Sequence, residues 1–321
     1  MRRPALLAAT AALLTLYGFA LAAEPTLLGR DTYLIPGAFP KDQQPDGNSI
    51  VLAAPAGLIV VDTGRHAPHT QKIVDFAHAQ DRPIVAIINT HWHLDHVGGN
   101  VLLRDQYPDV HVYASNALQG ALQGFLKNYR EQLEQAIAQA KEGQDVSAWR
   151  NEVRLIDAGA RLAPDHTIDK TSTLAIAGRT LTLHLERGAA TAGDIWVEDP
   201  ATHIVLSGDL VTLPVPFFDT ACPARWETSL DRIAAASFTT LIPGHGRPMS
   251  PQDFKSYRHA FSALLACAAS TQPSAACAQQ WIADAGALLD ADDRARVAPM
   301  LDYYMQAVLR SSSPHPDYCA A

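Results

Sequence analysis

The sequence predicts an α/β protein that ends in a helical C-terminal segment. Three observations support this prediction: continuous apolar runs of strand length, helical periodicity between them, and a largely helical pattern from about Pro251 to near Leu309. Continuous apolar runs are typical of strands that are buried on both faces. With 48% hydrophobic and 18% charged residues among 321, the composition is that of an ordinary globular protein.

Four apolar runs give the predicted strands, and each is followed by polar or ionisable residues. The runs are residues 58–61, 84–88, 204–206 and 241–242. The segments that follow them contain Asp62, His91, Asp209 and His245, respectively. Open α/β sheets build their sites where strands end, so we expect these segments to carry the function.

Helical patterns lie between and after these strands. Residues 68–79 form one candidate helix, and residues 118–137 form another, with Ser115 as its expected N-cap. The second shows one apolar face with three- and four-residue spacing. This face consists of Leu118, Leu122, Phe125, Tyr129, Leu133 and Ile137. Residues 173–185 alternate around a Gly178-Arg179 turn, which indicates a β-hairpin.

The N-terminus has the layout of a secretory signal peptide. Arg2 and Arg3 precede an apolar run over about residues 5–19, and small residues follow up to a cleavage position near Ala22 or Ala23. The alternative is a membrane anchor, but the run is shorter than the ~20 residues that a spanning helix needs. The pattern therefore predicts a periplasmic or secreted protein that is not held at the membrane after cleavage.

The charge balance argues against a nucleic-acid partner. The formal net charge is -8, and loss of the two leader arginines lowers it to about -10. Nucleic-acid binding requires clustered Lys and Arg, and the sequence has no basic run. We expect a small-molecule substrate instead, and the sequence makes no prediction of oligomeric state.

The four cysteines favour two disulfides. An even number outside the cytosol can pair, and four cysteines allow three connectivities. Cys267 and Cys277 flank residues 271–274, an expected turn between helices, so we favour that pair. Cys222 then pairs with Cys319. The spacing is not that of a zinc ribbon.

The strongest chemical signal is a cluster of histidines and one carboxylate after the strand at residues 84–88. His91, His93, Asp95 and His96 fall within six positions. Imidazole and carboxylate groups are preferred ligands of zinc. A loop lets His91 and His93 reach one ion while Asp95 and His96 reach a second. The alternative is a surface loop rich in histidine, which this spacing at the end of an apolar strand disfavours.

Residues 90–100, Thr-His-Trp-His-Leu-Asp-His-Val-Gly-Gly-Asn, resemble the metallo-β-lactamase superfamily. The resemblance extends over about residues 33–248. It implies that Asp62 braces the histidine loop, that Asp209 bridges two ions and that His245 is the last ligand. It also implies an αββα sandwich and a dinuclear zinc site. We accordingly divide the chain into a signal peptide (1–23), a metallo-β-lactamase-like domain (24–250) and a helical extension packed on that domain (251–321).

One ligand of this family pattern is missing. The family usually carries a histidine before a Thr-x-Gly-Asp turn, and here Ala190 precedes Thr191-Ala192-Gly193-Asp194. His184 is a possible substitute; otherwise it is an ordinary strand histidine. The first site would then contain His91, His93 and Asp209. The second would contain Asp95, His96, Asp209 and His245. The sequence leaves open whether one or two zinc ions bind, and whether another divalent metal such as manganese or iron binds instead.

The resemblance implies an exported metal-dependent hydrolase. Water ionised at the metal would attack an ester, thioester, lactone or amide, with Asp95 as the catalytic residue that orients the water and transfers its proton. An aspartate at position 209 favours thioesterase-like or lactonase-like hydrolases over dedicated β-lactamases. Two alternatives stay open: a metal-binding accessory protein with little or no hydrolytic activity, and a β-lactamase.

Overall fold

The computed structural model describes residues 25–40, 43–311 and 316–319, and the predicted signal peptide lies outside them. The described strands form a seven-stranded sheet of order β1-β2-β3-β4-β5-β6-β7 and a five-stranded sheet of order β12-β11-β10-β9-β8. The first sheet comprises β1 (Thr26–Gly29), β2 (Thr32–Ile35), β3 (Ser49–Ala54), β4 (Gly57–Val61), β5 (Ile84–Ile88), β6 (His111–Ala114) and β7 (His166–Thr167). The second comprises β8 (Ser172–Ile176), β9 (Arg179–Glu186), β10 (Asp194–Asp199), β11 (Ile204–Thr212) and β12 (Thr240–His245).

The two sheets pack face to face around an apolar core. Successive side chains of a strand point to opposite faces, so each sheet contributes every second residue to this layer. Ile59 and Val61 of β4 face the core from one sheet, and Leu181 and Leu183 of β9 face it from the other. The apolar runs predicted as strands are confirmed, with β11 extending beyond residue 206 to Thr212.

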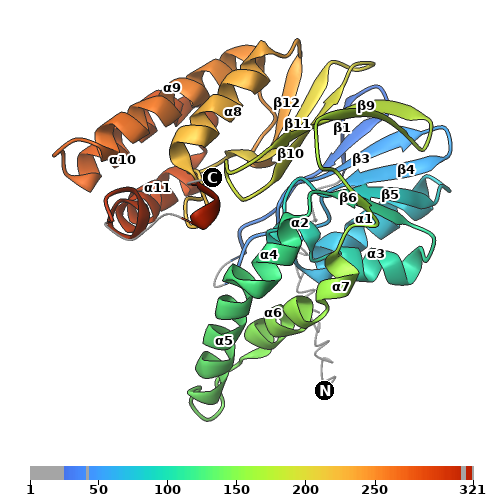
Figure 1. The fold of residues 1–321 in the computed structure, drawn as a ribbon, viewed down its shortest axis with the longest axis horizontal. Helices are drawn as coiled ribbons and strands as arrows, with labels where there is room; N and C mark the ends of the chain where they lie inside the picture. Colours follow the sequence, from blue (N-terminus) through green and yellow to red (C-terminus); the bar gives the residue numbers. More distant parts are fainter. Residues whose placement is uncertain (1–24, 41–42, 312–315, 320–321) are drawn as a thin grey trace, which may run out of the picture.

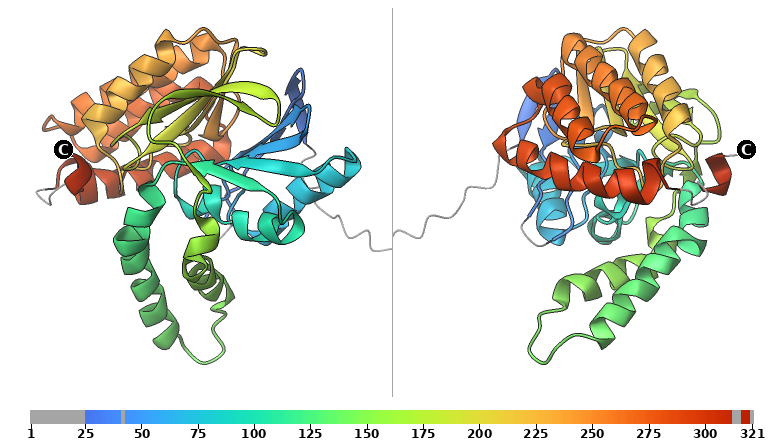
Figure 2. Two further views of the ribbon diagram at one scale, coloured as in Figure 1. Left: turned by 45° about the vertical axis from the view of Figure 1, so that its right-hand side comes forward. Right: turned by 90° about the vertical axis from the view of Figure 1, so that its left-hand side faces the viewer.

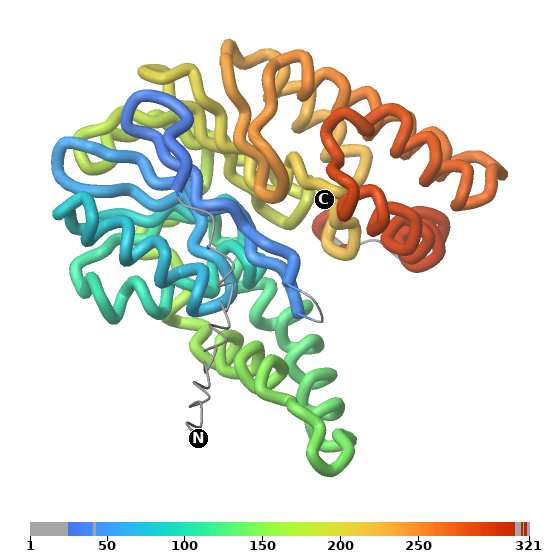
Figure 3. The backbone as a smooth tube through the Cα atoms, turned by 180° about the vertical axis from the view of Figure 1, so that it is seen from behind, coloured from blue at the N-terminus to red at the C-terminus, as the bar shows by residue number. Residues whose placement is uncertain are grey.

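Helices cover the outer face of each sheet, which confirms the predicted αββα sandwich with a helical C-terminal extension (Figures 1 and 2). On the first sheet lie α1 (Ala67–Ala79) and α3 (Asn100–Gln106). On the second lie α8 (Pro223–Ala235), α9 (Pro251–Ala268), α10 (Ser274–Ala285), η1 (Gly286–Leu288), α11 (Ala291–Tyr304) and η2 (Met305–Leu309), seen from behind in Figure 3. A Ser250 capping box begins α9.

A helical hairpin projects from the body next to the histidine loop (Figure 1). The histidine loop contains the short helix α2 (Leu94–Val97). The hairpin follows β6 and consists of α4 (Ala117–Gln123), α5 (Phe125–Ala138), α6 (Ser147–Asp157) and α7 (Gly159–Leu162). Leu118, Leu126 and Leu133 belong there to one apolar cluster with Trp92. The apolar stripe is therefore partly buried, although Phe125 is exposed.

Two details of the predicted helix at residues 118–137 are wrong. The helix is broken at Gly124, whose backbone leaves the helical region at φ -117° and ψ -102°. Ser115 is not its N-cap, because α4 begins after Asn116. The Ser115 hydroxyl instead donates to the Gly193 carbonyl at 2.7 Å. A contact with a distant loop thus replaces the expected local capping bond.

Two disulfides join the pairs that the sequence favours. Cys267–Cys277 links α9 to α10, and Cys222–Cys319 ties the short helix η3 (Asp317–Cys319) to the start of α8. Among the described residues, no helix combines the length and apolar character needed to cross a bilayer.

Candidate metal centre

The carboxyl ends of four strands place the predicted site residues. Strands β4 and β5 are parallel neighbours in the first sheet, and β11 and β12 are parallel neighbours in the second. Carboxyl ends of parallel strands share one edge, so the residues that follow them gather there. The loop before β3 joins the two edges: the Asn48 side chain donates to the carbonyls of Pro243 and Gly246, both at 2.9 Å.

The structure brings together all six residues that the sequence singles out as ligands. His91, His93 and Asp209 form one group, and Asp95, His96 and His245 form a second; within each group the potential ligand atoms lie within 4.8 Å of one another. Asp209 connects the groups, because its Oδ2 is 3.7 Å from His91 Nε2 and its Oδ1 is 3.3 Å from His96 Nε2. All six side chains are buried.

Asp62 and Thr90 orient two of the imidazoles. The Asp62 carboxylate accepts hydrogen bonds from Thr90 N at 2.8 Å, Thr90 Oγ1 at 2.7 Å and His96 Nδ1 at 2.8 Å. Since the single hydroxyl proton of Thr90 goes to Asp62, Thr90 Oγ1 accepts from His91 Nδ1 at 3.0 Å. In their neutral forms both histidines therefore direct an unprotonated Nε2 into the cluster, which is the form that binds metal.

The donor set fits a divalent cation. His96 Nε2 lies 3.3 Å from His245 Nε2, and His91 Nε2 lies 2.9 Å from His93 Nδ1. Asp209 Oδ1 is buried and has no hydrogen-bond partner among the described residues. A buried carboxylate oxygen without a donor is costly unless a cation compensates it. Imidazole nitrogens and carboxylate oxygens are a normal zinc ligand set.

The surroundings shift the pKa values of these groups in different directions. Burial alone would lower the pKa of His96, but the carboxylates of Asp209, Asp62 and Asp95 outweigh it and raise that pKa well above its ordinary value, so a metal that binds this ring displaces a proton. Burial lowers the pKa of His93 to about 4 and that of His91 well below its ordinary value, so both imidazoles are neutral at pH 7. Burial alone would raise the pKa of Asp209, but the neighbouring histidines, above all His96, outweigh it and lower that pKa. The carboxylate is therefore ionised.

A buried arginine links the second group to the helical hairpin. Arg65 lies 3.4 Å from Asp95 Oδ1 and forms an ion pair with Glu152 of α6. Neither residue was expected at the site from the sequence. Arg65 follows the Asp62-Thr63-Gly64 turn and could have been singled out by that position, whereas nothing local distinguishes Glu152 from other charged residues of its helix.

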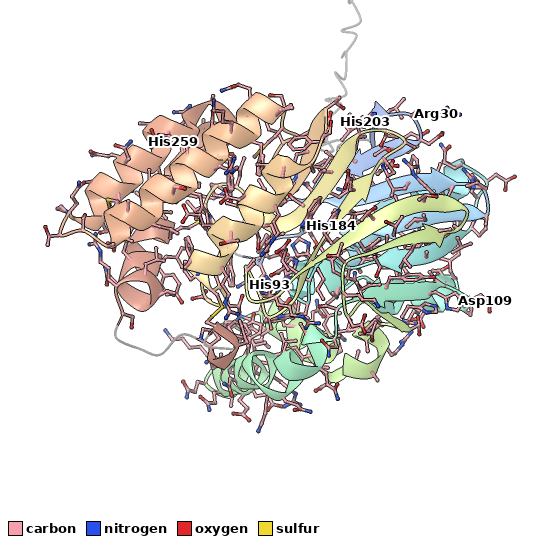
Figure 4. All side chains as sticks on the ribbon, turned by 45° about the horizontal axis from the view of Figure 1, so that its top comes forward. Arg30, His93, Asp109, His184, His203 and His259 are labelled. Atoms are coloured by element: carbon pink, nitrogen blue, oxygen red, sulfur yellow. A yellow bond between two sulfur atoms is a disulfide. The ribbon has the colours of Figure 1, made fainter. Side chains whose placement is uncertain are left out.

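The expected gap at position 190 is present, and His184 does not fill it. His184 stacks on Trp196 with ring centroids 3.6 Å apart and pairs with Glu198 at 3.1 Å. It belongs to β9, whereas His93 lies in the loop after β5 (Figure 4). Leu183 faces the core between the sheets, so alternation turns His184 to the outer face. Next to the buried Ala190 lies the hydroxyl of Thr220, which the sequence analysis also missed.

Aromatic rings border the centre, and a cleft lies on the far side of Arg65. Phe217 packs on His93 with centroids 5.0 Å apart, and Phe39 packs on His245 at 5.4 Å. A cleft of about 940 Å³ lies between the hairpin and the body, and its walls include Arg65, Tyr129 and Trp149. A small organic molecule has room there, separated from Asp95 by Arg65.

Relatives of known sequence support a family assignment. A linear primary-alkylsulfatase from Pseudomonas sp. is 29% identical over 226 residues, which cover 63% of this chain and 42% of the relative. A hydroxyacylglutathione hydrolase from Crocosphaera subtropica is 54% identical over 41 residues, which cover 13% of this chain and 16% of the relative. Each match thus spans less than half of the relative's length.

Solved structures share the fold. A metallo-beta-lactamase from Pontibacter korlensis aligns with a TM-score of 0.54 at 20% identity, covering 74% of this chain and 97% of that one. The metallo-beta-lactamase FIM-1 from Pseudomonas aeruginosa, in its mono-zinc form, aligns with a TM-score of 0.54 at 18% identity, covering 75% and 96%. The model of the metallo-beta-lactamase superfamily matches residues 44–271, more than half of the chain. The chain belongs to this superfamily of metal-dependent hydrolases.

Proposed function

We propose that this protein is an exported zinc-dependent hydrolase of a small molecule that contains an ester, thioester, lactone or amide bond. The observation that carries the proposal is the pair of buried donor groups joined by Asp209, whose Oδ1 has no hydrogen-bond partner among the described residues. Such a set of donors is suited to a cation rather than to a network of hydrogen bonds.

In this proposal the two groups hold one or two zinc ions. His91, His93 and Asp209 hold the first, and Asp95, His96 and His245 hold the second together with Asp209. Three protein donors are a normal set for a catalytic zinc that keeps an open position. The first group therefore does not need a histidine at Ala190, although the second group is richer in donors and is expected to bind more tightly.

The residues of the site then perform general acid–base chemistry. Bound zinc supplies Lewis acidity, which acidifies water to a pKa of roughly 7 and stabilises negative charge that develops on the substrate. Asp95 is placed to orient the attacking water and to carry its proton to the leaving group. Arg65 supports this role, because it lies 3.4 Å from Asp95 Oδ1 and holds that oxygen in place.

The relatives favour an ester-type bond. One is named an alkylsulfatase and the other a hydroxyacylglutathione hydrolase, so a sulfate ester belongs with the carboxylic esters and thioesters among the substrates to be tested. The solved neighbours with β-lactamase names keep a lactam within the panel. An accessory protein that binds metal without turnover is the second candidate, and the absent ligand at Ala190 favours it.

Metal content and a reporter panel test the proposal. The protein without residues 1–23 is purified, its zinc is counted by elemental analysis, and ester, thioester, lactone, sulfate-ester and cephalosporin reporters are assayed. His96→Gln is expected to lose zinc and turnover together. His184→Gln is the matched control, because His184 lies outside the donor groups. Zinc without turnover supports the accessory protein, and failure to bind zinc, manganese or iron refutes both.

Export is proposed from the leader and the two disulfides, which form in oxidising compartments. Expression of the full chain in a bacterium, followed by mass spectrometry of the protein in the periplasmic fraction, tests this. We expect a new N-terminus directly after Ala22 or Ala23. A full-length chain confined to the cytoplasm would contradict export.

A further inference from the structure

Thr220 contacts both the altered position of the site and one of its histidines. Its buried hydroxyl lies 2.9 Å from the carbonyl oxygen of Ala190 and 3.0 Å from His93 Nε2. A single side chain thus joins the residue that replaces the usual histidine to a member of the first donor group.

The direction of these hydrogen bonds is fixed by chemistry. A carbonyl oxygen can only accept a hydrogen bond, so Thr220 uses its single hydroxyl proton to donate to the carbonyl of Ala190. Thr220 Oγ1 must then accept from His93, which places a proton on His93 Nε2. The neutral ring keeps its lone pair on Nδ1, and this atom lies 2.9 Å from His91 Nε2 inside the donor group.

We propose that Thr220 is a positioning residue that holds His93 in the Nε2–H form and so presents Nδ1 to the metal. The carbonyl of Ala190 supports this arrangement because it accepts the hydrogen bond that the Thr220 hydroxyl donates. Position 190 thus contributes to the first donor group through its backbone and Thr220, although its side chain cannot coordinate. This inference rests on the proposed function insofar as a metal occupies the group.

The backbone around Thr220 is held from two sides. The Tyr318 hydroxyl donates to the Thr220 carbonyl at 2.5 Å, and the amide of Cys222 donates to the Ala189 carbonyl at 2.8 Å. The Cys222–Cys319 disulfide joins the segment that contains Thr220 to the segment that contains Tyr318. The hydroxyl is therefore fixed relative to the 189–190 turn, as a positioning role requires.

Nitrogen NMR of the histidine rings tests the proposal directly. In the metal-free and the zinc-loaded protein we expect His93 to carry its proton on Nε2. Thr220→Ser keeps the hydroxyl and is expected to retain this form. Thr220→Val has nearly the same shape without the hydroxyl, and its His93 is expected to populate both tautomers when metal-free. Protonation at Nδ1 in the wild-type protein overturns the proposal, and this result needs no variant to fold.

Zinc affinity supplies the second measurement. Loss of a partner that orients a metal ligand lowers metal affinity by roughly 10–100-fold, so chelator competition should show this loss for the first zinc site in Thr220→Val and recovery in Thr220→Ser. Equal affinity in Thr220→Val and wild type, with melting temperatures unchanged, overturns the proposal. If the wild type binds no divalent metal, the proposed function fails, and the tautomer in metal-free protein alone decides the role of Thr220.

Discussion

Replacing Arg65 by methionine is expected to destabilise the protein strongly. The guanidinium lies between the carboxylates of Asp95 and Glu152, and the three side chains are only 9%, 9% and 7% exposed. Removing one member of a buried ion pair typically costs about 3–5 kcal/mol, because the remaining charge is buried without compensation. Among the described residues, Glu152 would keep only the Tyr129 hydroxyl, at 3.5 Å. We therefore expect Arg65→Met to lower the free energy of unfolding by about 3–5 kcal/mol.

Urea denaturation of the metal-free protein at pH 7 measures this cost. Glu152→Gln alone should cost about 1–3 kcal/mol, because Arg65 keeps Asp95 but loses a charged acceptor. In the double variant the charges of Arg65 and Glu152 are both absent. Its loss in the free energy of unfolding should therefore fall short of the sum of the two single losses by more than about 0.5 kcal/mol.

A matched control lies on the same hairpin. Arg130 pairs with Asp157, but these side chains are 32% and 51% exposed. Solvent screens the charges of exposed pairs, so Arg130→Met should have little effect on the free energy of unfolding. A coupled, buried ion pair between Arg65 and Glu152 is refuted if Arg65→Met costs no more than Arg130→Met, or if the effects of Arg65→Met and Glu152→Gln add.

Three further predictions concern the centre and its supports. A Cβ on Gly244 would lie 2.0 Å from Asp209 Oδ1, so Gly244→Ala should displace that carboxylate and reduce the zinc bound per chain; unchanged zinc content by elemental analysis would contradict this. Burial, together with the charges of Asp209 and a neighbouring glutamate, raises the pKa of Asp194 from 3.8 to about 7. The folded protein then binds the extra proton, so this group's contribution to stability falls as pH rises from about 4 to about 7. Asp194→Asn should remove that decline in urea titrations across this range, and parallel pH profiles for variant and wild type would argue against it. The Cys222–Cys319 disulfide joins residues 97 apart, so its removal should cost about 5 kcal/mol, against about 3 for the second disulfide with a separation of 10; equal losses in urea denaturation would contradict the loop-entropy argument.

Much of the fold could be predicted because it depends on local patterns. The run at residues 84–88 is strand β5 with the same bounds, and the polar residues that follow it are part of the centre. Parallel neighbours bring their carboxyl ends to one edge, so the strand-end positions of Asp209 and His245 already indicated that the two residues lie close together. The outward direction of His184 also follows from alternation, once the leucines beside it are assigned to the core.

The residues that could hold a metal were recognisable from the sequence, since the ligand chemistry of imidazoles and carboxylates at strand ends depends on residue type and local position. The side chains that support these ligands were recognisable only in the folded protein. Thr220 reaches His93 across 127 positions, and Glu152 reaches Arg65 across 87. Such contacts depend on the path of the hairpin and of the segment before α8, and no periodic pattern near either residue records that path. For the same reason Ser115 bonds to Gly193 rather than capping its own helix.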